Sequence, residues 1–592
     1  MPKIVKDIIW RLDDLYKGFD DPAIEADKLL CMDKAGSFAE SYSGKVEGLS
    51  PEAFYKAVSI LERIEEVCEK IITFAYLSFV TETDNTGIGK LLQDAREFEG
   101  TIRSKTLFFT IEWAKASSKY TSGIMNHPAL SNYRHYLKKL KMFSAHRLSE
   151  PEEQIITAKL PGGREAWAAL FDKVTGSMRF GKKKDTLAQT LGKLHLSERT
   201  VRKRAAEDLT TGLEESLHIL SHIFNNIILD KTITDRLLAY HEWISKRNIE
   251  NGVKDSLVLK LVEKVTNRYD IVQRYYNIKK KLLGYDKLLD FDRSAPLPGI
   301  LDKKYSWNES KKIVINSFYD LSPTIGNTAS FFFEQEWIHA PVLKGKVNGA
   351  FSHPAVPSAH PFIFLNFTQT HKDLMTLAHE TGHGVHQFLS REQGLFNCRH
   401  SPVMAETASV FGEMAVFYFL LKRTKSKTEK LALICSKIED CINTIFRQTA
   451  LFSFENRLHK TRSSDGELET AQINRIWMET QKMMYKKSIH LSDHYSIWWA
   501  YIPHFIHCPG YVYAYAFAEL TALSLFNLYT KQKKEFIPVY IKFLKNSGKF
   551  GPAKLLKPFG IELDDQIFTK GINIIESLLN EAEQLSTGES II

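Results

Sequence analysis

Helical spacing of the apolar residues is the feature that most limits the folds open to this chain. In SPEAFYKAVSILERIEEVCEKIITFAYLSF, which starts at Ser50, apolar residues recur at intervals of three and four. That repeat is typical of an amphipathic helix. Ser50 supplies a capping hydroxyl, and Pro51 stands just inside the helix, where proline is favoured. The same spacing runs through residues 1–195 and again through 196–290, so we predict a mainly α protein.

Breaks in this pattern suggest how the chain is divided. A second helix start is expected at Ser149, because Glu152 completes a capping box three residues later. LPGG (Leu160–Gly163) then interrupts the helical pattern. The stretch Lys281–Ile300 contains two prolines and is interpreted as a crossing loop. We expect an N-terminal helical lobe at residues 1–195 and a second domain, which contains the histidine-rich stretch Leu377–Ser390, at residues 196–592.

A short region with a different period precedes the most informative motif. Its segments are rich in aromatic residues and are separated by glycine and proline, which is typical of short strands. They are ASFFFEQEWIHA (Ala329–Ala340), VNGAFSHP (Val347–Pro354) and PFIFLNF (Pro361–Phe367). We predict one small β-sheet here. Thr370, with Asp373 three residues on, then predicts the capped start of a new helix.

Bulk composition narrows the class of protein. The hydrophobic content of 44% and charged content of 25% are ordinary for a globular chain. The net charge of +9 comes from scattered lysines, without the aromatic or motif support expected of a nucleic-acid surface. The six cysteines form no CxxC pair, which favours reduced thiols. With no signal-like start and no apolar run of membrane-spanning length, we expect a cytoplasmic protein without a membrane partner.

The stretch LAHETGHGVHQFLS (Leu377–Ser390) contains three histidines and one glutamate that could bind a metal ion or take part in catalysis. His379 and His383 are four residues apart, so both imidazoles leave the same side of a helix and can hold one zinc ion. Glu380 can lie beside a zinc-bound water as a general base, which is the HExxH arrangement. The alternative is that these histidines are surface residues or hydrogen-bonded core residues. By its spacing His386 is not a ligand and is expected to pack or hydrogen-bond nearby.

A catalytic zinc needs a third protein ligand and an open position for water. A metzincin would place a third histidine where this chain has Leu389, so that class is excluded. Glu406 and Glu413 share one face of a later predicted helix with Val410 and Phe417. Burying this acidic pair without partners would be costly. We therefore predict that Glu406 is the third ligand and that Glu413 accepts a hydrogen bond from a ligand histidine. The alternative is two exposed glutamates.

These residues, with further stretches, resemble the oligoendopeptidase F branch of the thimet-oligopeptidase family. The members of this family are zinc metallopeptidases that cleave short peptides. The resemblance runs from about residue 10 to about residue 580, and the motifs in combination are specific to the family. It is carried by WRLDDLY (Trp10–Tyr16), KGKVNGAFSHP, FLNFTQTHKDLMTLAHETGH, AETAS and IPHFIHCPGYVYAYAFAEL (Ile502–Leu520).

The resemblance implies a fold and a set of roles. The fold would be a large two-lobed helical metallopeptidase with a deep central channel and one small β-sheet next to the HExxH helix. His379, His383 and Glu406 would hold one zinc ion, and Glu380 would be the general base. NGAF (Asn348–Phe351) resembles the edge strand of the family, which would bind a peptide by strand addition.

The C-terminal motif adds candidates that would face the substrate. The resemblance assigns this role to His504, Tyr511 and Tyr515. Their spacings of seven and four residues would allow one helix face to present all three. Tyr513 is an alternative to Tyr511, and the HCPG sequence before the tyrosines interrupts a smooth helix. Tyr515 or His504, together with zinc, would stabilise the oxyanion of the tetrahedral intermediate.

The expected function is a zinc-dependent oligoendopeptidase that hydrolyses internal bonds of short unstructured peptides. Its partners would be peptide substrates, without nucleic acid or membrane, and the chain would be a monomer or a weak homo-oligomer. One alternative is another HExxH peptidase with a carboxylate third ligand. A second is a peptide-binding or holdase-like helical protein with a catalytically silent zinc site. The metal used in the cell stays open, because affinity alone does not decide it.

Overall fold

The chain folds into two compact units, each built from separate segments of sequence. The structure, a computed structural model, describes residues 5–297 and 303–587. Unit 1 contains residues up to 144, 303–420 and 525–563. Unit 2 contains residues 145–302, 421–524 and those from 564 onward. These units divide the chain at other places than residue 195, and a separate N-terminal lobe at residues 1–195 stays a prediction.

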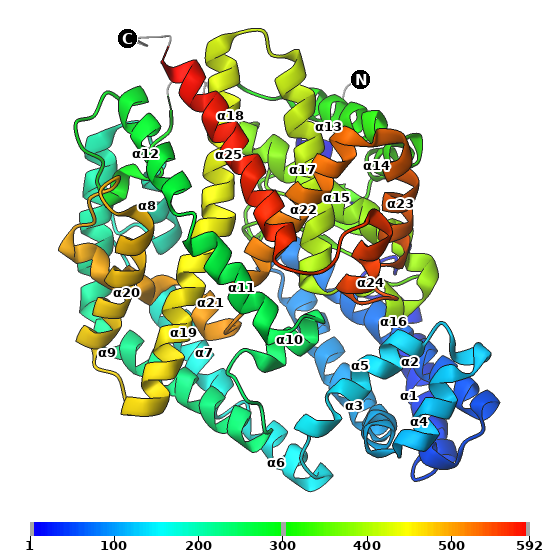
Figure 1. Cartoon of the computed structure of the whole chain (residues 1–592). Coiled ribbons are helices and arrows are strands. Elements are labelled where there is room, and N and C mark those ends of the chain that lie inside the picture. The colour runs from blue at the N-terminus through cyan, green and yellow to red at the C-terminus, as the bar shows by residue number, and fades with distance from the viewer. Residues whose placement is uncertain (1–4, 298–302, 588–592) are drawn as a thin grey trace. The chain divides into compact units, whose positions relative to one another are not determined.

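Unit 1 contains the small sheet, and it includes the N-terminal helices drawn in blue in Figure 1. Helices α17 (Pro402–Arg423) and α22 (Tyr513–Lys531) contribute residues to both units, and the larger part of α22 belongs to unit 2. The other helices of unit 1 are α1 (Pro22–Tyr42), α2 (Pro51–Thr81), α3 (Thr86–Lys115), α4 (Ser118–Asn126), α5 (Arg134–Met142), α13 (Trp307–Leu321), α14 (Pro323–Glu334), α15 (His371–Ser390), α16 (Leu395–Cys398), α23 (Lys533–Asn546) and α24 (Pro552–Leu556), together with most of α17.

Unit 2 consists of helices and the loops that connect them, and its described residues include none of the three strands of the sheet. In Figure 1 the C-terminal helix α25 runs alongside α18. The helices of this unit are α6 (Glu150–Lys159), α7 (Arg164–Ser177), α8 (Leu187–Lys193), α9 (Arg199–Leu237), α10 (Ser245–Asn251), α11 (Asp255–Thr266), α12 (Asp270–Leu282), α18 (Lys427–Cys441), α19 (Gln448–Asp465), α20 (Thr470–Tyr485), α21 (His504–His507) and α25 (Gln566–Ser586), with a π-helical turn at Ile442–Arg447.

The helix starts predicted from the capping residues Ser50 and Ser149 are confirmed. Ser50 accepts a hydrogen bond from the Ala53 N–H at the start of α2. Ser149 donates to Glu152 at the start of α6, which ends directly before LPGG. Residues 283–297 are irregular apart from a short 3-10 turn, as expected of the crossing loop, and the rest of that loop lies outside the described residues.

The predicted sheet is present and lies against α15, but it is smaller than expected. It contains β1 (Ile338–His339), β2 (Phe351–His353) and β3 (Phe362–Phe364), in the order β1-β3-β2. Strand β3 pairs parallel with β1 and antiparallel with β2, so β2 is an edge strand. Both β2 and β3 contact α15.

Two of the predicted strand segments need correction. Residues 329–334 belong to α14, which begins at Pro323 after the capping residue Ser322. The buried positions of that helix, including Ala329 and Phe332, follow helical spacing, so packing favours a helix over the aromatic strand pattern. In NGAF, only Phe351 belongs to strand β2, because the chain bends at Gly349 with a positive φ of 95°.

The core of unit 1 joins the N-terminal helices to the sheet. Trp10, from the WRLDDLY motif, packs with its ring centroid 5.9 Å from Phe362 and 5.8 Å from Phe364. The backbone of the same segment continues the contact, because the Ala340 N–H donates to the Ile8 carbonyl. One face of the sheet is therefore covered by the N-terminal part of unit 1.

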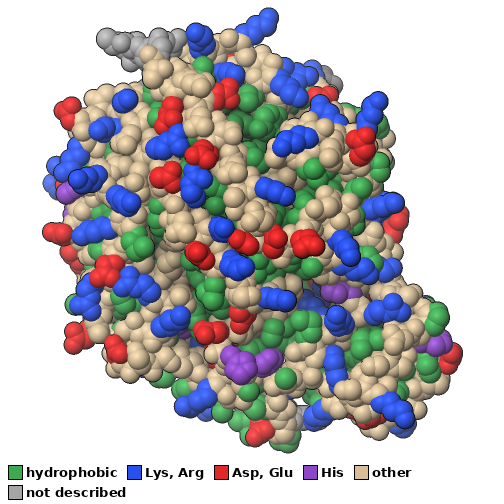
Figure 2. Space-filling view, viewed as in Figure 1, with side chains coloured by type: hydrophobic (Ala, Val, Ile, Leu, Met, Phe, Trp, Pro, Cys, Tyr) green, Lys and Arg blue, Asp and Glu red, His purple; other side chains and the backbone are tan. Residues whose placement is uncertain are grey.

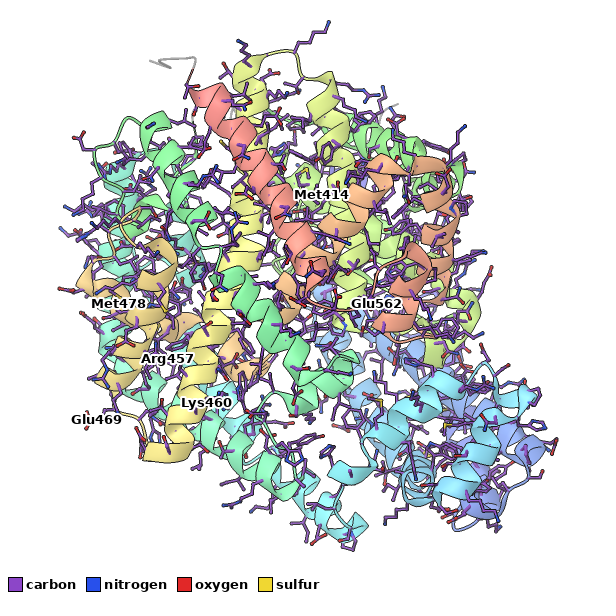
Figure 3. The ribbon with its side chains drawn as sticks, in the orientation of Figure 1. Met414, Arg457, Lys460, Glu469, Met478 and Glu562 are labelled. Carbon is purple, nitrogen blue, oxygen red and sulfur yellow. The ribbon has the colours of Figure 1, made fainter. Side chains whose placement is uncertain are left out.

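The distribution of charged residues, the state of the cysteines and the burial of the most apolar helix can be compared with the expectations from composition. On the face shown in Figure 2, basic and acidic side chains are interspersed. All six cysteines are free, and Cys508 alone of the six is more than marginally exposed. Helix α17 is long and apolar enough to span a membrane by length and composition, but 67% of its most apolar window is buried, as in a core helix. Met414 of this helix, labelled in Figure 3, has no exposed surface.

Candidate metal centre and active site

Helix α15 presents the two histidines of the HExxH motif. A capping box fixes its start, because the Asp373 N–H donates to Thr370 Oγ1 and the Thr370 N–H donates to Asp373 Oδ2. The imidazole rings of His379 and His383 lie with their centroids 4.8 Å apart and their planes at 78°. One helix face therefore offers two ring nitrogens to a common point.

Glu406 of α17 brings an oxygen to the same point. Its Oε2 lies 3.3 Å from His379 Nε2 and 3.5 Å from His383 Nε2. The three ligand atoms all lie within 4.8 Å of one another. Bonds of 2.0–2.2 Å to a tetrahedral zinc place its ligand atoms about 3.3–3.6 Å apart. The donor set and the two distances from Glu406 Oε2 to the histidine nitrogens therefore fit a zinc ion. Glu406 is the carboxylate that was predicted from the sequence as the third ligand.

Glu413 orients the first of these histidines. Its Oε1 lies 2.5 Å from His379 Nδ1, and Glu413 is on the same face of α17 as Glu406, about two turns further along the helix. A proton on Nδ1 donated to this carboxylate leaves the Nε2 lone pair directed at the ligand set. The predicted hydrogen bond between Glu413 and a ligand histidine is thus present.

Charge in this cluster favours a cation. Burial alone would lower the pKa of His379, but hydrogen bonds to Glu406 and Glu413 raise it well above its usual range. Burial alone would raise the pKa of Glu406, but hydrogen bonds with His379 and His383 hold it well below its usual range. Glu406 thus favours either a proton or a metal ion at His379 Nε2, while Glu413 accepts the proton of Nδ1.

Glu380 lies beside the ligand set with little exposure to water. Its exposed fraction is 6%, and burial raises its pKa above the usual value while His379 and His383 oppose the shift. A buried carboxylate next to two imidazoles can accept a proton from a nearby water and return it. Its position on α15 between the two histidines is the one expected of a general base.

Small residues let the two ligand-bearing helices approach. A Cβ at Gly382 would lie 2.8 Å from Ser409 Cα, and a Cβ at Gly412 would lie 3.3 Å from Gly382 Cα. Ser409 Oγ also donates to the Glu406 carbonyl at 3.0 Å. The distance between His379 and Glu406 therefore depends on two glycines where α15 and α17 cross.

The ligand face of α15 continues to the edge strand. Gln387 lies one turn after His383, and its Nε2 donates to the Ser352 carbonyl at 3.1 Å. The Ser352 hydroxyl donates to Gln387 Oε1 at 2.7 Å. Strand β2 is thereby fixed to the helix that carries the histidines.

His504, Tyr511 and Tyr515 come together in unit 2. His504 Nε2 lies 3.4 Å from the Tyr515 hydroxyl, and the rings of Tyr511 and Tyr515 are 5.2 Å apart. They do not share one helix face, because α21 ends at His507 and α22 begins at Tyr513. The spacing would have allowed one helix face to present all three, but the interruption expected from the HCPG sequence is present, since residues 508–510 form a turn between the two helices.

The structure favours Tyr511 over Tyr513 in this group. Tyr513 is 1% exposed, and its hydroxyl donates to Asn248 and accepts from Asn251, so it is a core residue. Tyr511 and Tyr515 are both partly exposed. Glu455, which the sequence did not suggest, accepts the Gly510 N–H at 2.8 Å and holds the turn in place.

His386 and His360 pack and hydrogen-bond near the motif. His386 is 1% exposed, hydrogen-bonds Ser547 and stacks on His400 with centroids 3.8 Å apart. This confirms the prediction that it packs and hydrogen-bonds nearby. His360 lies 3.0 Å from Asp14 of the WRLDDLY motif and stacks on Trp337.

Comparison with known proteins decides the family. The sequence model of peptidase family M3 matches residues 193–569, and the model described as oligopeptidase F matches residues 112–180. The chain belongs to peptidase family M3. As an M3 peptidase, it is a metallo-endopeptidase that acts on oligopeptides. This confirms the resemblance found in the sequence.

Relatives of this M3 peptidase match it over most of their length. An oligoendopeptidase F homolog of Borreliella burgdorferi is 25% identical, over 91% of this chain and 92% of the relative. Oligopeptidase PepF of Bacillus subtilis is 23% identical, over 97% and 87%. The crystal structure of oligoendopeptidase-F from Enterococcus faecium shares the fold, with a TM-score of 0.72 at 20% identity over 96% of this chain and 99% of that one.

Proposed function

We propose that this M3 peptidase is a zinc-dependent oligoendopeptidase in which Glu380 is the general base. The observation that carries the proposal is the convergence of His379 Nε2, His383 Nε2 and Glu406 Oε2 next to the buried Glu380 carboxylate. A zinc ion held by these ligands would act as a Lewis acid toward water and the peptide carbonyl.

The residues of the chain account for the proton transfers. The Glu380 carboxylate takes a proton from the attacking water as its oxygen bonds to the peptide carbon. It then gives that proton to the leaving nitrogen as the C–N bond breaks, which regenerates the carboxylate. The hydrogen bond from His379 Nδ1 to Glu413 keeps the ring fixed throughout.

His504, Tyr511 and Tyr515 are proposed as substrate-facing residues. His504 and Tyr515 each carry a hydrogen-bond donor that suits an oxyanion, and Tyr511 packs beside Tyr515. The assignment rests on the resemblance of the C-terminal motif. Removing one oxyanion donor typically lowers kcat by about 10²–10³-fold.

Strand β2 is proposed to bind the peptide. It is the edge of the sheet, and Gln387 ties it to the ligand face of α15. An extended peptide that adds to this edge would be held through its backbone, which suits substrates of varied sequence. Short unstructured peptides can adopt this extended conformation, and we propose that they are the substrates, in the cytoplasm.

A cleavage assay tests this proposal. A mixture of unstructured peptides of about five to about thirty residues is incubated with the enzyme and read by mass spectrometry. We expect internal cuts that stop when a chelator removes the metal and return when zinc is added. One bound zinc per chain without any cleavage would instead support a peptide-binding protein with a silent site.

A further inference from the structure

Strand β2 has an inner edge, which pairs with β3, and an outer edge, which faces away from the sheet. Ile363 donates its N–H to Trp337 on the β1 side, so Phe362 and Phe364 direct their backbone groups to β2. Phe351 and His353 are their partners, which leaves the N–H and carbonyl of Ser352 on the outer edge. A peptide that adds to this edge would therefore pair around Ser352.

Gln387 limits what this edge can offer. Its side chain already occupies the Ser352 carbonyl and hydroxyl, on the α15 side of the strand. Pro354, the next residue that would point outward, has no N–H to donate. The register of an added peptide is thus tied to Ser352.

Side chains on the other face of β2 form a small aromatic surface. Tyr76 of α2 lies with its ring centroid 5.8 Å from both Phe351 and His353. Phe351 in turn stacks on Phe364 at 4.8 Å. We call the set Tyr76, Phe351 and His353 the aromatic wall; all three side chains are half-buried.

The aromatic wall is uncharged near neutral pH. Burial, with a smaller effect of Arg399, lowers the pKa of His353 to about 4. Burial raises the pKa of Tyr76, partly opposed by Arg96. A neutral aromatic surface attracts apolar and aromatic side chains more than charged ones.

We propose that the aromatic wall sets the side-chain preference of the enzyme. This inference rests on the proposed binding of peptide to β2. Residues directly opposite each other in paired strands point to the same face, so the peptide residue opposite Ser352 faces α15. Its two neighbours then face the wall, beside Phe351 and His353. The enzyme therefore prefers apolar or aromatic side chains at these two positions and is tolerant at the position between them.

Tyr76 is the residue to change, because it contributes to the wall from a helix outside the sheet. Quenched-fluorescence peptides carry Phe or Ala at each position in turn, and the ratio of kcat/KM for Phe over Ala is measured. For the wild type we expect ratios of about three to ten at alternating positions. Tyr76→Ala lowers these ratios to about one, and Tyr76→Phe retains them.

Two further variants make the result specific. Tyr76→Lys places a cation at the wall through a long flexible side chain, so acidic side chains become preferred at the same positions. Tyr55→Ala is the matched control, since Tyr55 lies on the same helix, is 44% exposed and is outside the wall. It leaves the ratios unchanged. Metal content and thermal melting are recorded for every variant.

The outcomes separate this inference from the proposed function. Unchanged ratios in folded Tyr76→Ala and Tyr76→Lys, or a wild-type preference without alternation, would overturn it. Peptide affinity is also measured by fluorescence anisotropy on Glu380→Gln, where binding does not require cleavage. The same alternation in affinity without any cleavage by the wild type would reject the catalytic proposal and support the wall.

Discussion

His379 is the residue whose surroundings are most closely specified. Its two ring nitrogens face different carboxylates, Glu413 on Nδ1 and Glu406 on Nε2. The two carboxylates raise the pKa of His379, which favours its doubly protonated, charged form when no metal is bound. A metal ion must displace the Nε2 proton of that form to bind there.

Metal affinity should consequently depend on pH. Below the raised pKa of His379 the proton competes with the metal, so apparent affinity falls as pH is lowered, by about tenfold per pH unit for each proton displaced. Competition against a chelator of known affinity between pH 6 and pH 8 measures this. A pH-independent affinity across that range would contradict the assigned ligand set.

Glu413 gives a second test at this scale. Glu413→Ala removes the acceptor for His379 Nδ1, and we expect metal affinity to fall by about 10–100-fold. Glu413→Gln keeps an acceptor oxygen without the charge, so its metal affinity should lie between that of the wild type and that of Glu413→Ala. Equal affinity of all three proteins, read by zinc titration, would show that Glu413 does not support the site.

At the scale of elements, the crossing of α15 and α17 controls the site. Gly382→Ala would place a methyl 2.8 Å from the backbone of Ser409, so one helix must move. We expect a loss of about 1–3 kcal/mol in unfolding free energy, and weaker metal binding as Glu406 shifts.

Gly36→Ala is the control for this substitution. Gly36 lies within α1, and an added methyl there meets nothing within 4 Å. Replacing glycine by alanine inside a helix should stabilise it by about 0.5–1 kcal/mol. Denaturant unfolding measures both changes, and an equal effect of the two substitutions would contradict the proposed role of the helix crossing.

Features that depend on residues close together in sequence could be predicted from the sequence. The capping pairs and the four-residue spacing of His379 and His383 act within one helix, so both were predicted. Ala329–Glu334 was taken for a strand because its aromatic run outweighed Ser322 and Pro323, which begin α14. The contact of Gln387 with Ser352 joins residues far apart in sequence, and no local pattern indicated it.

At the scale of the whole molecule, metal binding should stabilise unit 1. All three ligands belong to this unit, and a ligand that binds only the folded state raises unfolding free energy by about 2.7 kcal/mol at a hundred times its Kd. The melting temperature should therefore rise with added zinc. In His383→Ala this rise should disappear; its persistence would place the stabilising zinc elsewhere.

Turnover of Glu380→Gln, with bound zinc measured in the same preparation, tests the proposed role of Glu380 most directly. Glutamine cannot take the proton of water, but it leaves His379, His383 and Glu406 in place. We predict one zinc per chain and peptide cleavage reduced by about 10²–10⁴-fold. Cleavage at the wild-type rate by the zinc-loaded variant would contradict the assignment of Glu380 as the general base.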